Sequence, residues 1–130
     1  MKRFLFVFTL ILLTASIASA QDKDASLVIV GDAVYDFGDI KEEAGPATHT
    51  FTVKNAGESP LIITRVQPSC GCTASDYTKE PIAAGKTGEI SATFNPSGQR
   101  GAFTKTVSVF SNGKTGSYIL TIKGNVISKQ

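Results

Sequence analysis

The residues best suited to chemistry are the two cysteines of the chain, which lie in Pro68-Ser69-Cys70-Gly71-Cys72-Thr73 with one glycine between them. Cysteines two positions apart can bring their Cα atoms within the roughly 4.4–6.8 Å that a disulfide requires, and Gly71 eases the backbone constraint between them. A crosslink stabilises a fold more when it closes a longer loop, and this loop would be very short. A bridge between Cys70 and Cys72 would therefore serve some purpose other than holding the fold together.

Three interpretations of this Cys-Gly-Cys element stay open. In the first, the cysteines end a strand, either packed as small apolar side chains or joined in a local bridge. In the second, Cys70, Gly71 and Cys72 form a thiol–disulfide exchange centre, although redox motifs usually place two residues between the cysteines and a helix after them. In the third, Cys70 and Cys72 bind a soft metal such as Cu(I). A structural zinc would need about two more ligands, and the sequence offers one His, His49, and one Met, Met1.

No other residues form a recognisable catalytic pattern. Serine, histidine and aspartate occur without a nucleophile elbow, and the glycines lack the strand–loop–helix context of a phosphate site. The acidic pair Glu42-Glu43 is expected to be surface charge. We expect His49, which shares a strand face with Phe51 and Val53, to be a partly buried residue near the start of its strand. The sequence therefore predicts no catalytic residues, no cofactor and no small-molecule substrate.

The first 20 residues have the pattern of an export signal. Lys2 and Arg3 precede an apolar run over residues 4–13, and Ala18-Ser19-Ala20 resembles a signal-peptidase site. The run is shorter than the roughly 20 residues that span a bilayer, so we expect cleavage between Ala20 and Gln21 and no membrane insertion afterwards. The mature chain is then a soluble periplasmic or extracellular protein.

The charge balance points away from nucleic acid. Two of the 13 basic residues are Lys2 and Arg3, so the mature chain carries 11 basic and 11 acidic residues. A neutral chain with both signs interspersed has no basic stripe for phosphates. We expect an unidentified protein partner instead.

After a short polar tether over residues 21–26, the chain has the pattern of an all-β domain over residues 27–130. Short segments rich in Val, Ile, Thr, Phe and Tyr are separated by Gly, Pro, Asn and Ser, and none holds a helical period. This pattern predicts an immunoglobulin-like, two-sheet antiparallel sandwich of about seven strands, without the usual inter-sheet disulfide and core Trp. The expected strands are residues 27–30, 34–37, 48–54, 61–66, 88–94, 103–110 and 117–126.

Alternation predicts which side chains face the core. Ile90, Ala92 and Phe94 should point inward, as should Phe51 and Val53. The same holds for Phe103, Val107 and Val109 and for Tyr118, Leu120 and Ile122, whereas Lys105 falls in the inward phase and indicates either a bulge or a side chain that extends to solvent. Asn112-Gly113 is typical of a tight hairpin turn between the last two strands.

The sequence resembles a bacterial family of exported proteins, domain of unknown function 1573, which is particularly frequent in Bacteroidota. The resemblance covers residues 35–126, and Ser69-Cys70-Gly71-Cys72-Thr73 is its most specific part. The other matching segments are Phe37-Gly38, Phe51-Thr52-Val53-Lys54-Asn55-Ala56-Gly57, Leu61-Ile62-Ile63, Pro81-Ile82-Ala83-Ala84-Gly85, Phe94-Asn95, Arg100-Gly101-Ala102-Phe103-Thr104-Lys105, Ser111-Asn112 and Ile122-Lys123-Gly124-Asn125-Val126.

This resemblance implies an immunoglobulin-type sandwich similar to Hydin-like domains, and it implies no reaction. Taken with the residue patterns, it favours an exported, non-enzymatic module that binds a protein or stabilises an assembly in the bacterial envelope. The alternative is a thiol redox or soft-metal-handling protein that uses Cys70 and Cys72.

Overall fold

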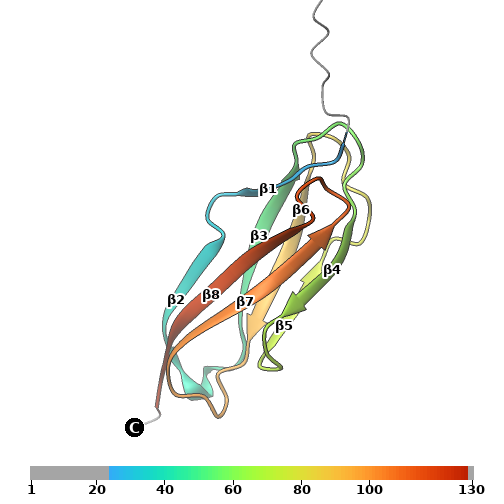
Figure 1. Cartoon of the computed structure of the whole chain (residues 1–130). Coiled ribbons are helices and arrows are strands. Elements are labelled where there is room, and N and C mark those ends of the chain that lie inside the picture. The colour runs from blue at the N-terminus through green and yellow to red at the C-terminus, as the bar shows by residue number, and fades with distance from the viewer. Residues whose placement is uncertain (1–23, 129–130) are drawn as a thin grey trace, which may run out of the picture.

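The computed structural model describes residues 24–128, which form eight strands and one short 3-10 helix (Figure 1). The predicted signal peptide, residues 1–20, lies outside the described residues, as do residues 21–23 of the tether. Within residues 24–128, no helix is long and apolar enough to cross a bilayer. The elements are β1 (Leu27–Val30), β2 (Val34–Lys41), η1 (Glu42–Ala44), β3 (Ala47–Asn55), β4 (Ile63–Pro68), β5 (Thr73–Tyr77), β6 (Thr87–Phe94), β7 (Gly101–Ser111) and β8 (Ser117–Ile127).

The strands form two four-stranded sheets, one in the order β1-β3-β6-β5 and the other in the order β2-β8-β7-β4. The predicted all-β, immunoglobulin-like sandwich is confirmed, with eight strands instead of about seven. One pair, β2 with β8, is parallel, whereas an antiparallel sandwich was predicted. The reason is that the chain turns at Gly31, where φ is 86°, and passes from the first sheet to the second. Figure 1 shows this passage between β1 and β2.

Side chains that alternate along the strands fill the space between the sheets. The inward residues predicted for β3 and β6 are buried, with Val53, Ile90, Ala92 and Phe94 at 0% exposure. The ring of Phe94 stacks on that of Phe103, with centroids 3.9 Å apart. The other predicted inward residues that the structure buries are Phe51, Val107, Val109, Leu120 and Ile122.

The pairing of β7 with β8 shows whether Lys105 lies at a bulge. The two strands pair without a register shift from Gly101 and Val126 to Phe110 and Ser117. No bulge therefore occurs at Lys105, which is half-buried.

The turn between β7 and β8 differs from the predicted Asn-Gly hairpin. The connection runs over residues 112–116, and the positive φ of 80° belongs to Gly116. Asn112 instead accepts a hydrogen bond from the Ile62 amide at 2.8 Å and donates one to the Pro60 carbonyl at 3.1 Å. The turn is longer than a two-residue hairpin because the Asn112 side chain makes its hydrogen bonds to the segment before β4.

The start of β4 and the whole of β5 also differ from the prediction. Leu61 forms only an isolated bridge with Ile82, and β4 begins at Ile63. The predicted strand over residues 61–66 is therefore shifted along the chain by two residues. Strand β5, which was not predicted, is short and polar, and it pairs with β6 at the sheet edge.

The packed domain begins before residue 27, within the segment predicted as a tether. Ala25 is buried, and the carbonyl of Asp24 accepts a hydrogen bond from the Glu58 amide. This approach depends on Gly57, because a Cβ there would overlap the Asp24 carbonyl oxygen. The absence of a side chain at Gly57 therefore lets the 24–26 segment pack against the 55–59 turn.

Asn55 organises the same turn from inside the protein. Its side chain, 0% exposed, accepts hydrogen bonds from the amides of Ser26 and Gly57 and donates to the carbonyls of Ser59 and Ile82. A buried polar group is tolerated only when its hydrogen bonds are made, and all of those of Asn55 are. Asn55 is therefore a structural residue.

Candidate functional site

The Cys-Gly-Cys element lies in the connection between β4 and β5, where the chain crosses from one sheet to the other. Figure 1 shows this connection at the side of the sandwich. Cys70 and Cys72 are joined in a disulfide with an S–S distance of 2.06 Å and a Cα–Cα distance of 5.4 Å. The ring therefore contains a single intervening residue, Gly71.

Backbone hydrogen bonds hold the chain on both sides of this ring. Before it, the amide of Ser69 donates to the Thr106 carbonyl at 2.8 Å, and the Thr106 amide donates to Ser69 Oγ at 3.2 Å. After it, the carbonyl of Cys72 accepts from the Asn95 amide at 3.0 Å. None of these bonds involves a sulfur atom, so Thr106 of β7 and Asn95, directly after β6, hold the ends of the ring in addition to the disulfide.

The side chain of Thr73 faces both sulfur atoms. Thr73 Oγ1 lies 3.8 Å from Cys70 Sγ and 4.0 Å from Cys72 Sγ. Because a disulfide sulfur carries no hydrogen, the hydroxyl is the donor in either contact. Thr73 is 3% exposed, whereas both cysteines are half-buried and Gly71 is exposed. The single hydroxyl hydrogen can therefore point to one or the other sulfur atom, in a ring that is partly exposed to solvent.

The bonded state of the cysteines bears on the three interpretations of the sequence. The local bridge is present, and thiol–disulfide exchange would begin from it. Metal binding by Cys70 and Cys72 would first require reduction, because a disulfide offers no thiolate. Among residues 24–128, no group of three or more His, Cys, Asp or Glu side chains is placed to hold a metal.

His49 lies in an aromatic cluster that links the two sheets. Its ring stacks on Tyr35 of β2 with centroids 3.7 Å apart and meets the edge of Phe51 at 4.7 Å. Partial burial among these rings lowers the pKa of His49. The imidazole is therefore a neutral packing element near pH 7, and it is half-buried near the start of its strand.

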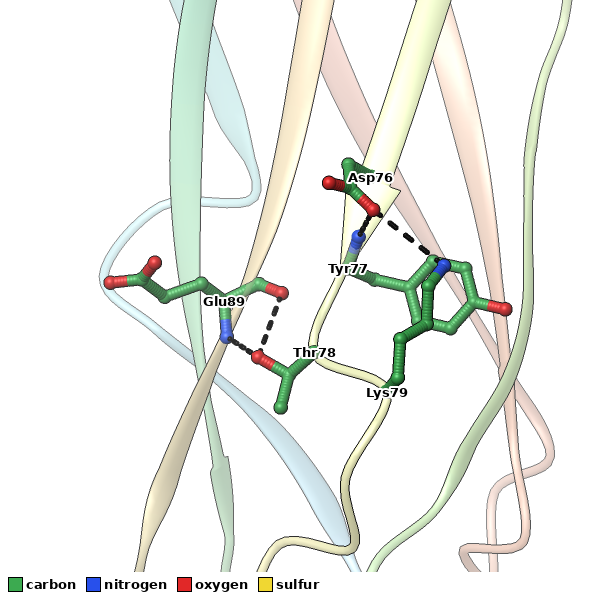
Figure 2. A network of polar contacts seen from close by, with 5 residues as sticks. All are labelled: Asp76, Tyr77, Thr78, Lys79 and Glu89. Atoms are coloured by element: carbon green, nitrogen blue, oxygen red, sulfur yellow. Dashed lines mark hydrogen bonds and ion pairs between the residues drawn. The ribbon is translucent and has the colours of Figure 1, made fainter.

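A shallow polar hollow of about 310 Å³ lies on the outer face of the first sheet. Figure 2 shows the network at its rim, in which the Glu89 amide donates to Thr78 Oγ1 at 2.9 Å and the Tyr77 amide donates to Asp76 at 2.9 Å. The ammonium of Lys79 lies 3.6 Å from the Asp76 carboxylate and 3.3 Å from the centre of the Tyr77 ring. These contacts lie at the C-terminal end of β5.

The exposed apolar side chains gather where the chain passes between the sheets. We call β1, β2 and their connection, residues 27–41, the crossover edge. Four of the seven large apolar side chains exposed within the described residues lie on it. They are Val28, Val30, Val34 and Tyr35.

The family model described as Protein of unknown function (DUF1573) matches residues 28–126, which include the whole Cys-Gly-Cys ring and all but the ends of the sandwich. The chain belongs to this family. The resemblance expected from the sequence is thereby confirmed, and the DUF1573 description carries no reaction. No curated protein matches the chain significantly.

Solved structures with the same fold support a DUF1573 domain of immunoglobulin or PapD type. A protein of unknown function from Porphyromonas gingivalis W83 has a TM-score of 0.67 at 13% identity, covering 87% of this chain and 51% of that chain. The ASH/PapD-like domain of human CEP192 has a TM-score of 0.64 at 10% identity, covering 87% and 93%. The YadV chaperone has a TM-score of 0.53 at 14% identity, covering 81% and 53%. The chain thus spans about half the length of the Porphyromonas protein, and these likenesses show the fold alone.

The sequence pattern located the Cys-Gly-Cys ring of this DUF1573 chain, but not the residues that form hydrogen bonds to the ring and to its ends. Cys70, Gly71 and Cys72 were singled out by their spacing, whereas Thr73 was treated only as the end of the motif. Asn95 and Thr106 anchor the ring through backbone groups and lie more than 20 positions from it in the sequence, so no residue pattern indicates their role. Thr73 could have been found as the only hydroxyl residue adjacent to Cys72.

Proposed function

We propose that this DUF1573 chain is exported through residues 1–20 and acts in the bacterial envelope as a non-enzymatic protein-binding module. The fold is one of unknown-function and PapD-like domains, which is consistent with binding rather than catalysis. The proposed protein binding does not require Cys70, Gly71 or Cys72. The partner is a protein, and the periplasm or the cell exterior is the proposed compartment.

The observation that carries the proposal is the crossover edge together with the part of β3 that β1 leaves uncovered, since these strands are each paired on one side only. Strand β1 covers β3 only along Thr52–Asn55, so within the described chain residues 47–51 of β3 have only β6 as a neighbouring strand in their sheet. Strand β2 likewise pairs only with β8. Unpaired strand edges carry free backbone donors and acceptors, which an extended segment of another protein can satisfy by adding a strand.

Apolar side chains at this edge favour a partner segment with hydrophobic residues. Val30 is 51% exposed and Val34 is 49% exposed, on either side of the turn at Gly31. Burying such side chains against a partner is favourable by about 25 cal/mol per Å² of apolar surface. Backbone pairing would give affinity, and the two valines would select the partner's side chains.

Affinity capture from the envelope fraction tests the proposal with a matched control. The double variant Val30→Lys with Val34→Lys places two charges on the crossover edge, and Ile62→Lys places one at a side chain of similar exposure, 40%, before β4. We expect the wild type and Ile62→Lys to recover the same partner and the double variant to lose it. Recovery of no consistent partner, or equal loss in both variants, would count against the proposal.

Export is tested separately by expressing the full chain in a bacterial host and measuring the intact mass of the protein in each fraction. We expect the mature product to begin at Gln21 and to leave the cytoplasm. Retention of residues 1–20 in the product, or accumulation in the cytoplasm, would contradict the proposed compartment.

A further inference from the structure

We infer that the Cys70–Cys72 disulfide is a thiol–disulfide exchange site that takes two electrons from a protein dithiol, while the sandwich around it stays folded. This inference goes beyond the proposed binding function and uses a different part of the molecule. Four features of the ring lead to it: its size, its independent anchoring, its exposure and the placement of Thr73.

The size of the ring argues against a structural staple. Cys70 and Cys72 are two positions apart, so the bond restrains only Gly71 between them. The stabilisation from a crosslink grows with the length of the loop that it closes, and this loop is close to the shortest possible. Breaking the bond therefore removes little restraint from the unfolded chain.

The flanking chain keeps its place without the bond. Ser69 is held on β7 through Thr106, and Cys72 is held through its carbonyl by the Asn95 amide. After reduction, the two thiols stay close because their backbone neighbours do not move. Re-formation of the disulfide is then an intramolecular reaction between positioned groups, which makes the site reversible.

The ring is open to an attacking thiolate. Gly71 is exposed, and no heavy atom outside its chain neighbours lies within 4 Å of the point where a Cβ would sit. Both cysteines are half-buried, and Cys72 packs against the edge of the core. Exchange requires access to a sulfur atom along the S–S axis, and a connection at the side of the sandwich offers more access than a core disulfide.

The hydroxyl of Thr73 is placed to assist the leaving sulfur. A thiolate of the partner dithiol attacks one sulfur of the ring, the S–S bond breaks, and its electron pair goes to the other sulfur, which leaves as a thiolate. Thr73 Oγ1 lies 3.8 Å from one sulfur and 4.0 Å from the other, so it can donate its hydrogen to whichever sulfur becomes anionic. Thr73 thus contacts both reacting sulfur atoms and can stabilise the leaving thiolate whichever sulfur is attacked.

The second step of the reaction releases the partner and completes the transfer of two electrons. The other thiolate of the partner attacks the mixed disulfide, the partner becomes a disulfide, and the first ring sulfur leaves as a thiolate. Two electrons have passed from the partner dithiol to Cys70 and Cys72, and two protons complete the two thiols. A protein with two neighbouring thiols is therefore the substrate class.

The first test follows reduction of the purified chain under native conditions. The protein is treated with dithiothreitol or with reduced thioredoxin as the protein dithiol, and free thiols are counted by alkylation and intact mass while circular dichroism monitors the fold. We expect both reagents to reduce the disulfide with the fold retained. Reduction only at the rate of global unfolding, or by dithiothreitol alone, would overturn the inference.

The second test concerns Thr73 and uses a matched pair of variants. Thr73→Val keeps the buried shape without the hydroxyl, and Thr73→Ser keeps the hydroxyl. Loss of a hydrogen bond to the leaving thiolate should slow reduction by about three- to tenfold in Thr73→Val, with the rate restored in Thr73→Ser. In the reduced protein, the pH profile of alkylation should shift to higher pH in Thr73→Val only. Equal rates and profiles in both variants would overturn the role of Thr73.

Discussion

Removing the Cys70–Cys72 bond should lower the free energy of unfolding by about half as much as removing a disulfide that closes a loop of about 15 residues. We consider the double variant Cys70→Ser with Cys72→Ser and, separately, the reduced wild type. The ring comprises three residues, since the cysteines are two positions apart. In the chain-entropy description, a closed loop of about three residues contributes about 5.4 cal/mol/K, or about 1.6 kcal/mol at 25 °C, against about 3 kcal/mol for a loop of about 15 residues.

The surroundings of the ring keep this value small. Both cysteines are half-buried and Cys72 packs against the core, so serine in their place removes some apolar contact but leaves no large cavity. The anchoring hydrogen bonds of Ser69 and Cys72 use backbone atoms or the Ser69 hydroxyl. With a urea m-value of roughly 1.5–2 kcal/mol/M for a domain of this size, the denaturation midpoint should fall by about 1 M.

Urea denaturation, followed by circular dichroism with and without reductant, measures this change. The double serine variant is the control, because reductant should shift the midpoint of the wild type and leave that of the variant unchanged. A loss of more than about 4 kcal/mol, or of the cooperative transition itself, would refute the reasoning. It would mean that the bond, and not β6 and β7, holds the β4–β5 connection in place.

Three further predictions concern the interior. Asn55→Ala should lower the free energy of unfolding by about 2–4 kcal/mol, because it removes a fully buried side chain together with its four hydrogen bonds to backbone groups. Asn112→Ala removes two hydrogen bonds at an exposed position and should cost about 1 kcal/mol or less in the same thermal or urea melts. Equal effects of the two variants would contradict the role of burial. Phe94→Ala should cost about 3–5 kcal/mol, since the ring is fully buried and stacked on Phe103, and a loss below about 1 kcal/mol would mean that the core repacks. Burial lowers the pKa of His49 in the folded protein, so as the pH falls the imidazole is protonated more readily in the unfolded chain. The free energy of unfolding of the wild type should therefore decrease as the pH falls below about 6.5, before the carboxylates begin to titrate. His49→Phe, which removes the only histidine, should flatten that part of the curve, and an unchanged slope would contradict the assignment.

Much of the sandwich could be predicted because alternation is a local property of a strand. The inward positions of β3, β6, β7 and β8 follow from side chains that point to opposite faces at successive residues. Strand β5 could not be predicted in this way, because Thr73–Tyr77 is short and polar and is a strand only through its pairing with β6. The turn at residues 112–116 was mispredicted for a related reason. Asn112 has a partner 50 positions away in Ile62, and that contact overrides the local preference of Asn-Gly.

By itself, the amino-acid sequence determined the fold class, the inward faces of the strands and the segment in which two cysteines could meet. These features depend on residue type and on spacing over a few positions, which the backbone geometry converts directly into structure. Only the tertiary structure decided that β2 pairs in parallel with β8, that the 24–26 segment packs, and that Thr106 and Asn95 hold the ends of the ring. These three features depend on contacts between segments that are far apart in the sequence, and a local residue pattern does not show which distant segments will meet. The ring itself could be found from spacing, but the hydrogen bonds that anchor its ends could not.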